Sequence, residues 1–525
     1  MTKRQIITRL LLILGILILV NIISIRLFTR LDLTSTKAYT LSDASKNLVR
    51  SLDDKFLVKA YFTSDLPSPY NNHRRFMQDQ LDDFRAYGKG KFEYEFIDPS
   101  SKPEVEQEAQ RYGIPPVQVQ VLKNDKFQVE KAYMGLVFLY GDKQERLPVV
   151  QTFDKLEYDI SSNVKKLTSR RLSKIGFLSG QYEPALDKME EFRQTLSNQY
   201  EVTTVDLSGG KAVPPDISVL TIVSPRRKFS DWEKYLIDQY IMRGGRVAFF
   251  IDKVDANLQQ QAASPLDAGL DDLLETYGVR INADLVRDTR CANITVSQQS
   301  GFMIFQSQVP FPYFPMGSEF NQNNVLVKNL PAVMFYFVSS VDTTPARASG
   351  VEIDVLLTSS RQSGRMHSPF MIVPTMQFTR DMFPEKHIPL AVTVQGPFKS
   401  LYAQRPVIID TSVHTPIDTA NRLRETSAAK IVVIGDGNFV QHETMGSRDN
   451  LAFAGALIDW LTDDVGLTTI RTREVAAKPL DEIQEGTKTL VKSVNLAVPP
   501  LLVIVAGVLR WRMRVAWRKR IQMSP

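Results

Sequence analysis

Residues 216–252 read DISVLTIVSPRRKFSDWEKYLIDQYIMRGGRVAFFID, which is a strand, a helix and a second strand in that order. The apolar runs in DISVLTIVSP and GRVAFFID have the length of buried strands. Between them, Ser230 and Glu233 have the spacing of a capping box at a helix start, and Gly244-Gly245 end the helix. Two buried strands joined by a helix are typical of a parallel sheet with helices on its faces.

The flanking segments extend this pattern into one α/β domain. Before the stretch, strands are expected in KIGFLSG (174–180) and YEVTTVDL (200–207), with a helix between them. Well after it, a strand, a helix and a last strand are expected in KIVVIGDGNFV (430–440), LAFAGALIDWL (451–461) and TTIRTREV (468–475). We predict a doubly wound parallel sheet built from two parts of the chain, residues 173–290 and 429–475.

Residues 291–428 interrupt this domain and differ from it, because the helical pattern fades. Strands are expected in MIFQSQV (303–309), AVMFYFVSS (332–340) and LAVTVQG (390–396), with the proline-rich PFPYFPM (310–316) as a break. The segment is therefore predicted to be a β-rich insertion.

Residues 31–152 form a separate predicted domain with the element order β-α-β-α-β-β, and residues 153–172 a helical connector behind it. This order resembles a thioredoxin-like fold. RYGIPPVQV (111–119) is similar to the stretch of that family in which a cis-proline precedes the third strand, which places this role on Pro116. The family's redox cysteines are missing from TSDLPSPYN (63–71), so we expect a scaffold without thiol chemistry.

Both ends of the chain carry an uncharged apolar run. Residues 10–25 read LLLILGILILVNIISI, and residues 494–509 read VNLAVPPLLVIVAGVL, followed by the basic RWRMRVAWRKR. We predict transmembrane anchors in residues 1–30 and 494–525, with residues 476–493 as a linker. A cleaved signal peptide is the alternative for the first run, but no small-x-small cleavage site follows it. The positive-inside rule then places both termini in the cytoplasm and the main body outside a bacterial inner membrane.

The net charge of +6 is concentrated at these ends. Residues 1–30 and 510–525 contain basic residues and no acidic ones, so the remainder of the chain is slightly acidic. The basic surplus therefore suits lipid headgroups, and no nucleic-acid partner is expected. The single cysteine, Cys291, excludes an intrachain disulfide and a four-cysteine zinc site.

The order of segments resembles one family, the GldG-like auxiliary subunits of ABC transporters, which are named for gliding motility. The resemblance is carried by LDLTSTKAYTLSDASKNLVRSL (31–52), KIGFLSGQYEP (174–184), residues 216–252, KIVVIGDGNFV and NLAFAGALIDWL (450–461). It implies a polytopic permease as partner, a cytoplasmic ATPase that dimerises on the permease, and a second domain similar to class I glutamine amidotransferases.

The candidate ligand site lies at the carboxyl ends of the predicted parallel strands, where open α/β sheets bind ligands. Gly180, Asp252 and Asp436 each end such a strand, and Asn438 belongs to the same turn as Asp436. The alternative is that both aspartates only form turns or cap helices.

Catalysis is not predicted. Cys291 follows the polar RDTR instead of a strand and a glycine elbow, and His367, His387, His414 and His442 are scattered. The turn IGDGN lacks the Lys-Ser/Thr of a phosphate-binding loop, and no metal or cofactor site is expected.

The aromatic residues Phe311, Tyr313 and Phe314 form a possible surface for a partner or a sugar; the alternative is a rigid loop packed on the domain. We therefore predict a non-catalytic, membrane-tethered extracytoplasmic subunit that binds a permease and an envelope ligand. The rival hypothesis is an envelope hydrolase that uses the crevice near Asp252 and Asp436.

Overall fold

The structure is a computed structural model. It describes residues 40–462 except 69, 124–125, 151–152, 154, 170, 301–302, 318, 325, 329, 331, 347–349, 408–419 and 442–447, together with residues 12, 13, 15, 466, 468, 470 and 485–522. The chain divides into two compact units, Met1–Ala476 and Ala477–Pro525.

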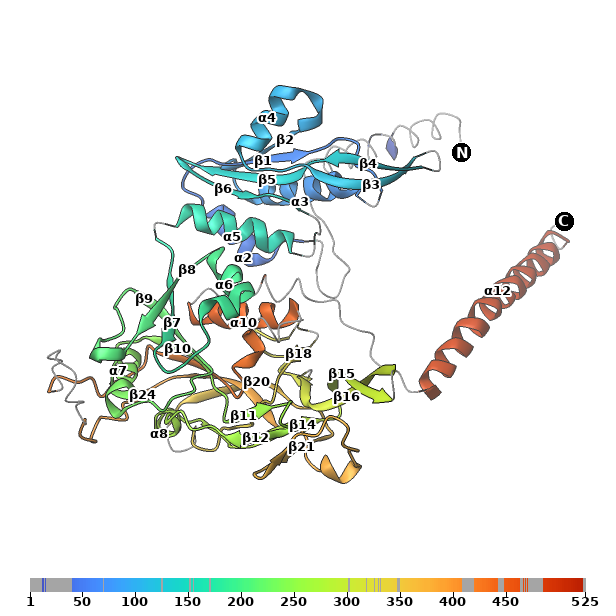
Figure 1. Ribbon diagram of the computed structural model, residues 1–525. Helices are drawn as coiled ribbons and strands as arrows, with labels where there is room; N and C mark the ends of the chain where they lie inside the picture. The colour runs from blue at the N-terminus through green and yellow to red at the C-terminus, as the bar shows by residue number, and fades with distance from the viewer. Residues whose placement is uncertain are drawn as a thin grey trace. The chain divides into compact units, whose positions relative to one another are not determined.

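The first sheet of unit 1 has four strands in the order β2-β1-β5-β6. These strands are β1 (Phe56–Phe62), β2 (Phe92–Ile97), β5 (Met134–Tyr140) and β6 (Lys143–Leu147). Strand β1 is parallel to β2 and antiparallel to β5, and β5 is antiparallel to β6. The accompanying helices are α2 (Asp43–Arg50), α3 (His73–Tyr87), η1 (Pro99–Ser101), α4 (Pro103–Arg111) and α5 (Leu156–Thr168) (Figure 1).

Local sequence signals explain where α2 and α4 begin and where α4 ends. The side chain of Ser42 caps α2 by accepting the N–H of Ser45. Pro103 occupies the first turn of α4, where a missing N–H costs nothing. Gly113 follows α4 with φ of 76°, a conformation that suits glycine.

The strand after Pro116 does not join the central sheet. It is β3 (Val117–Lys123), and it pairs with β4 (Lys126–Ala132) as a separate two-stranded hairpin. Among the described residues the cis peptide bond lies at Ser368–Pro369, so the prediction of a cis-proline at Pro116 is wrong. The chain enters a hairpin here and not a strand of the central sheet, so the structural role expected of that proline does not arise.

The second sheet has eight strands in the order β17-β20-β23-β26-β10-β9-β7-β8. They are β7 (Lys174–Ser179), β8 (Glu201–Asp206), β9 (Ile217–Val223), β10 (Arg246–Phe250), β17 (Glu319–Phe320), β20 (Glu352–Thr358), β23 (Pro389–Gln395) and β26 (Lys430–Ile434). The run from β8 to β26 is parallel, whereas β23, β20 and β17 are added antiparallel. Three strands from within residues 291–428 thus extend the main sheet.

Helices cover both faces of this sheet. On one face, α6 (Glu190–Ser197) and α10 (Arg448–Leu461) pack in a core with strand residues such as Phe177, Ala248 and Ile434. On the other face, α7 (Asp231–Met242) and α8 (Asp271–Thr276) pack with Leu220, Val247 and Val433. The sequence predicted α7 and its capping box, and both are confirmed.

Short pairings complete unit 1. They involve β11 (Val254–Asn257), β12 (Ala262–Pro265), β13 (Arg280–Ile281), β14 (Leu285–Asp288), β15 (Cys291–Ser300), β16 (Met303–Gly317), β18 (Val333–Met334), β19 (Val341–Asp342), β21 (Ser363–Met366), β22 (Phe370–Met371), β24 (Phe398–Lys399) and β25 (Glu425–Thr426). The 3-10 turns are η2 (Leu186–Met189), η3 (Ser208–Gly210), η4 (Arg380–Met382) and η5 (Asn438–Val440).

Three expected strand boundaries are corrected. The prolines of residues 310–316 do not interrupt β16, which runs through them. Of residues 332–340, only Val333–Met334 is a strand. In the expected last strand, residues 468–475, Thr468 and Ile470 are helical and the others lie outside the described residues. Ile470 is buried against Tyr158 of α5. This residue therefore packs on a helix and does not belong to a strand of the sheet.

Unit 2 contains α12 (Glu485–Gln522), which includes the end of the expected linker and the whole run 494–509. Within the part of the chain that the structure describes, no helix combines the length and the apolar character needed to cross a bilayer. The expected first anchor lies outside the described residues apart from Leu12, Ile13 and Gly15.

Candidate functional site

The carboxyl ends of β9, β10 and β26 meet at one edge of the main sheet, because these strands are adjacent and parallel. Asp252 follows β10, and the turn that contains Asp436 and Asn438 follows β26. Asp252 Oδ1 accepts the Gly437 N–H at 2.8 Å and the Asn438 side-chain amide at 3.1 Å. The structure therefore brings together Asp252, Asp436 and Asn438, as the sequence predicted for these three residues.

Asp436 binds backbone on both sides of its carboxylate. Its Oδ1 accepts the N–H of Asn438 at 2.7 Å, which fixes the turn into η5. Its Oδ2 accepts the N–H of Tyr336 at 2.7 Å, which ties the segment between β18 and β19 to the sheet edge. Close by, the Ser339 N–H donates to the carbonyl of Gly435 at 2.8 Å. Asp436 thus joins two segments that are distant in sequence.

Both aspartates are buried, with 2% of Asp252 and none of Asp436 exposed. Burial raises the pKa of Asp252, while the Gly437 N–H opposes the rise. Burial also raises the pKa of Asp436, and the charge of Asp252 raises it further. The pair therefore keeps a proton to higher pH than free carboxyl groups do. Buried carboxylates that bind backbone N–H groups match the alternative anticipated from the sequence, in which these residues hold turns.

This pair should make the stability of the protein depend on pH. A raised pKa in the folded state means that the folded protein binds the proton more tightly than the unfolded chain, so the free energy of unfolding falls as pH rises from about 4 through the folded pKa. Asp252→Asn retains an oxygen for Gly437 and removes the repulsion between the pair. We expect this variant to lose less stability than the wild type between pH 5 and pH 8, as measured by urea unfolding.

The matched control for this measurement is Asp267→Asn. Lys228 holds the pKa of Asp267 below its ordinary value, so this carboxyl group is already ionised across the same range. Between pH 5 and pH 8, Asp267→Asn should lose as much free energy of unfolding as the wild type. An equal loss in Asp252→Asn would show that the pair does not share a proton.

Gly180 does not belong to this group. It ends β7, which is separated from β10 by β9, and its φ of 116° suits glycine. A Cβ there would lie 3.1 Å from Asp206 Oδ1, so Gly180 faces the end of β8. Strand β9 thus lies between Gly180 and the two aspartates.

The aromatic residues expected as a partner surface are largely buried. Phe311 and Tyr313 are fully buried in a small core with Leu285, Phe370 and Ile372, and Phe314 packs against this core. A buried ring cannot contact a partner, so this prediction is wrong for Phe311 and Tyr313. Phe311 and Tyr313 instead agree with the alternative, in which these rings pack on the domain.

Cys291 begins β15 and is partly buried. Burial raises the pKa of its thiol to about 11, whereas a nucleophilic cysteine needs a lowered pKa. Within the described residues, no group of three or more His, Cys, Asp or Glu side chains is placed to hold a metal ion.

A polar cavity of about 520 Å³ lies beside β14 and β21 and was missed by the sequence analysis. Its lining includes Asn282, Asp284, Ser340, Asp342, Arg365 and His367. Asp284 is buried and accepts the N–H and hydroxyl of Ser340 at 2.8 and 2.6 Å, and Arg365 pairs with Glu385. Asp284 and Arg365 at this cavity therefore already have partners within the chain.

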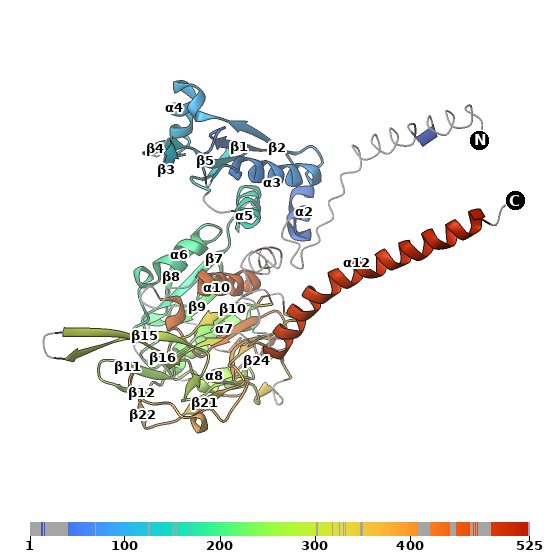
Figure 2. The ribbon, with the colours of Figure 1, turned by 90° about the vertical axis from the view of Figure 1, so that its right-hand side faces the viewer.

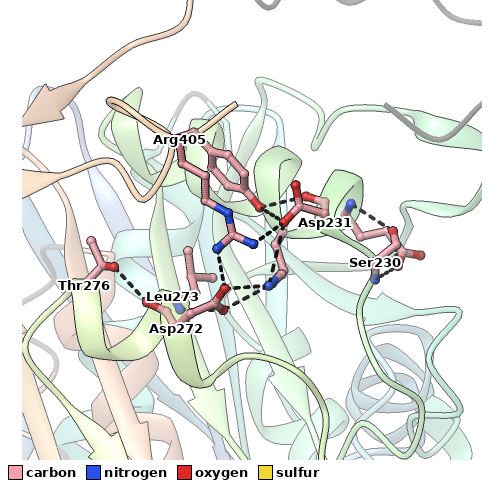
Figure 3. Close-up of polar contacts among 9 residues, drawn as sticks. Ser230, Asp231, Asp272, Leu273, Thr276 and Arg405 are labelled. Carbon is pink, nitrogen blue, oxygen red and sulfur yellow. Dashed lines mark hydrogen bonds and ion pairs between the residues drawn. The ribbon is translucent and has the colours of Figure 1, made fainter. Parts of the chain in front are cut away.

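A second missed feature is a charged network at the amino ends of α7 and α8 (Figure 3). Arg405, from the loop after β24, donates to Asp231 at 3.0 Å and to Asp272 at 2.7 Å. Lys234 Nζ lies 2.8 Å from Asp272 Oδ2, and the Tyr402 hydroxyl donates to the Asp231 carbonyl at 2.8 Å. The network fastens the loop to both helices. Its carboxylates and bases come from separate segments, so no local sequence pattern reveals it.

Lys234 should contribute more to stability than Arg405 within this network. The side chain of Lys234 is 10% exposed, whereas that of Arg405 is 40% exposed. Lys234→Met removes the less exposed of the two bases that bind Asp231 and Asp272, whose side chains are 13% and 36% exposed. This change should cost about 2 kcal/mol, while Arg405→Met should cost below about 1 kcal/mol. Chemical denaturation of both variants measures the difference. If both variants lose the same free energy of unfolding, burial does not decide how much each base contributes to stability.

Comparison with known proteins connects this fold to a transport system. The family model described as "ABC-type uncharacterized transport system" matches residues 172–458, and a model for a domain of unknown function (DUF7088) matches residues 35–139. An uncharacterized protein of Borreliella burgdorferi is 24% identical over 500 residues, which cover 93% of this chain and 94% of that protein.

Among solved structures, the N-terminal domain of mmIFT52 is similar at 14% identity, over 55% of this chain and 97% of that chain, with a TM-score of 0.33. A score this low carries no argument about fold or function. The family match, in contrast, covers more than half of the chain, including the parallel strands, Asp252 and Asp436. The chain therefore belongs to this family and is an auxiliary component of an ABC-type transport system.

Proposed function

We propose that this chain is a non-catalytic, GldG-like subunit whose folded body lies on the extracytoplasmic side of the bacterial inner membrane. There it would bind a polytopic permease and, through the permease, a cytoplasmic ATPase. An envelope ligand would bind the exposed body, in transport or in gliding motility. The observation that carries the proposal is the family match over residues 172–458, because an auxiliary component acts through its partners.

The geometry at the sheet edge supports a non-catalytic role. A hydrolase needs carboxyl groups that reach a substrate, with room between them for a water molecule or a reacting bond. Asp252 and Asp436 are buried, and Asp252 Oδ1 and both carboxylate oxygens of Asp436 accept hydrogen bonds from the chain itself. These contacts favour a structural function for the pair.

The two folded domains are consistent with a scaffold function. We propose that residues 31–152 form a thioredoxin-like domain, and the sheet order β2-β1-β5-β6 supports this assignment. We also propose that the second domain is amidotransferase-like, with helices on both faces of a largely parallel sheet. Neither domain assignment implies a catalytic nucleophile, because residues 63–71 contain no cysteine and the pKa of Cys291 is raised.

Membrane tethering is proposed through the apolar runs at both ends. In α12, Leu496, Leu501 and Ile504 are 80%, 60% and 64% exposed. Exposed aliphatic side chains beside the basic stretch 510–520 suit contact with acyl chains and phosphate headgroups. Both termini would then be cytoplasmic.

The decisive experiment is purification of the tagged full-length chain from detergent-solubilised membranes. We expect a polytopic permease and an ATPase with a phosphate-binding loop to copurify, identified by mass spectrometry. Recovery of the chain alone, with permease and ATPase present in the same membranes, would refute the proposal.

The hydrolase alternative needs a separate test that preserves the fold. Asp252→Asn keeps the oxygen that binds Gly437 but cannot act as a general base. Retained transport or motility in cells that carry this variant, with normal protein levels, is expected. Loss of function with an unchanged melting temperature would favour the hydrolase.

A further inference from the structure

The polar cavity of about 520 Å³ lies where two short strand pairs meet. Strand β13 pairs with β19, and β14 pairs with β21, both antiparallel. Residues 282–284, between β13 and β14, line the cavity together with residues 340–343, Arg365 and His367. Strand β21 lies at the end of the second domain that is remote from α6 and α10 (Figure 2). The volume is within the roughly 300–1,000 Å³ that small-molecule pockets have.

The buried side of the cavity is acidic and is held by hydrogen bonds. Asp284 is fully buried, and its two carboxylate oxygens accept the N–H and the hydroxyl of Ser340. The side-chain amide of Asn282 donates to the same hydroxyl at 2.9 Å. Burial raises the pKa of Asp284, and the Ser340 bonds and the charges of Arg365 and His367 oppose this rise. Because each carboxylate oxygen can accept a second hydrogen bond, the internal bonds orient Asp284 without saturating it.

A second carboxylate, Asp342, is nearer to the opening. Its side chain is 25% exposed and lies 3.8 Å from Arg280. Burial acts to raise the pKa of Asp342, but the N–H and hydroxyl of Thr344 and the charge of Arg280 bring it below its ordinary value. Asp342 is therefore ionised at neutral pH, and it adds a negative charge to the cavity.

Two bases stand at the opening on the side of β21. Arg365 and His367 are exposed and two positions apart, which is the spacing of side chains on one face of an extended chain. Arg365 binds Glu385 through Nε at 2.9 Å and Nη2 at 2.5 Å, so its Nη1 has no partner among the described residues. His367 likewise forms no hydrogen bond or ion pair within the described part of the chain. Donors of positive charge therefore face solvent beside an acidic interior.

This arrangement favours a ligand that carries both charges. No three His, Cys, Asp or Glu side chains among the described residues are placed to hold a metal ion. A lone anion would be repelled by Asp284 and Asp342, and the lining residues include no Phe, Tyr or Trp on which a sugar could stack. Val341, Ile388 and Pro389 add apolar surface that suits a small aliphatic side chain.

We propose that this cavity binds a short peptide whose ammonium and carboxylate groups are both free. The ammonium group donates to Asp284 and Asp342, and the carboxylate accepts from Arg365 Nη1 and His367. Charge-assisted hydrogen bonds of this kind are about twice as strong as neutral ones. The inference rests on the proposed function, because it gives the chemical class of the envelope ligand, and it can be tested without the permease.

Calorimetric titration of the detergent-purified full-length chain tests the proposal. The probes are alanylalanine and trialanine, together with alanylalanine that is acetylated at its amino end or amidated at its carboxyl end. We expect at least one unblocked peptide to bind with a Kd below about 1 mM. Each blocked form should bind at least about tenfold more weakly, because it loses the charge-assisted bonds at one end.

Two variants assign the two ends of the peptide. His367→Ala should weaken the unblocked peptide about fivefold or more and leave the amidated form unchanged, because this form has no carboxylate to lose. Asp342→Asn should weaken the unblocked peptide and leave the acetylated form unchanged. Arg361→Ala removes an exposed base that does not line the cavity and should alter none of these affinities. Melting temperatures of all variants verify that they fold.

The other outcomes overturn the proposal. Absence of binding by both unblocked peptides up to about 10 mM would show that the cavity is not a peptide site. Equal affinity for blocked and unblocked forms would show that the charges are not used, and glucose or inorganic phosphate that binds as tightly would assign another ligand class. Peptide binding in a chain that recovers no permease would contradict the proposed complex and leave the cavity assignment intact.

Discussion

Replacing Asp436 by alanine should lower the free energy of unfolding by about 2–5 kcal/mol. The carboxylate accepts the N–H groups of Tyr336 and Asn438, both at 2.7 Å, in a fully buried position. Each N–H left without an acceptor costs about 1–3 kcal/mol. Removal of the repulsion with Asp252 offsets part of this loss. Urea unfolding of the purified protein at pH 7 measures the difference.

Two further variants distinguish the hydrogen bonds from a general effect of removing an aspartate. Asp381→Ala changes an exposed residue of η4 and should alter stability by less than about 0.5 kcal/mol. Asp436→Asn keeps one acceptor oxygen and should fall between alanine and the wild type. If Asp436→Ala costs no more than Asp381→Ala, the carboxylate does not hold the Tyr336 segment.

The elements that the sequence predicts well are those with complete local signals. In residues 216–252, two apolar runs, a capping box and a glycine pair define β9, α7 and β10, and the structure has all three. Strand β4 was missed because KFQVEKA mixes Lys126, Glu130 and Lys131 with few apolar residues.

Long-range pairing explains what the sequence analysis could not predict in the main sheet. LAVTVQG was recognised as a strand, but nothing local indicates that it pairs antiparallel with β26 on one side and β20 on the other. Its neighbours are separated from it in the chain by other elements. The apolar content of a strand predicts burial, and the identity of its partners depends on the whole fold.

The same distinction holds at the candidate site. The rule that parallel strands end at one edge was sufficient to place Asp252 beside Asp436 and Asn438. It did not indicate that β9 separates Gly180 from them, because strand order is not a local property. The main partner of Asp436 on the distant segment is the backbone N–H of Tyr336, which every residue except proline would offer. That contact therefore has no sequence signature.

Gly435→Ala should destabilise the fold by about 3 kcal/mol or more. A Cβ at this position would lie 2.0 Å from the carbonyl oxygen of Ser339, and backbone cannot move aside as a flexible side chain can. Overpacking costs about 1–3 kcal/mol, and a shift of the Ser339 segment would also weaken the Ser339-to-Gly435 hydrogen bond, worth about 1 kcal/mol.

Gly350→Ala provides the comparison for this close approach. Gly350 has φ of 73° but no atom within 4 Å of an added Cβ, so alanine there should cost about 1 kcal/mol from backbone strain alone. Because Gly435 immediately precedes Asp436, a clash at residue 435 would also displace the carboxylate from Tyr336. We therefore expect Gly435→Ala and Asp436→Ala to be non-additive when combined, with a double-variant cost below the sum of the two. Full additivity would mean that Ser339 and Tyr336 are held at the sheet edge independently.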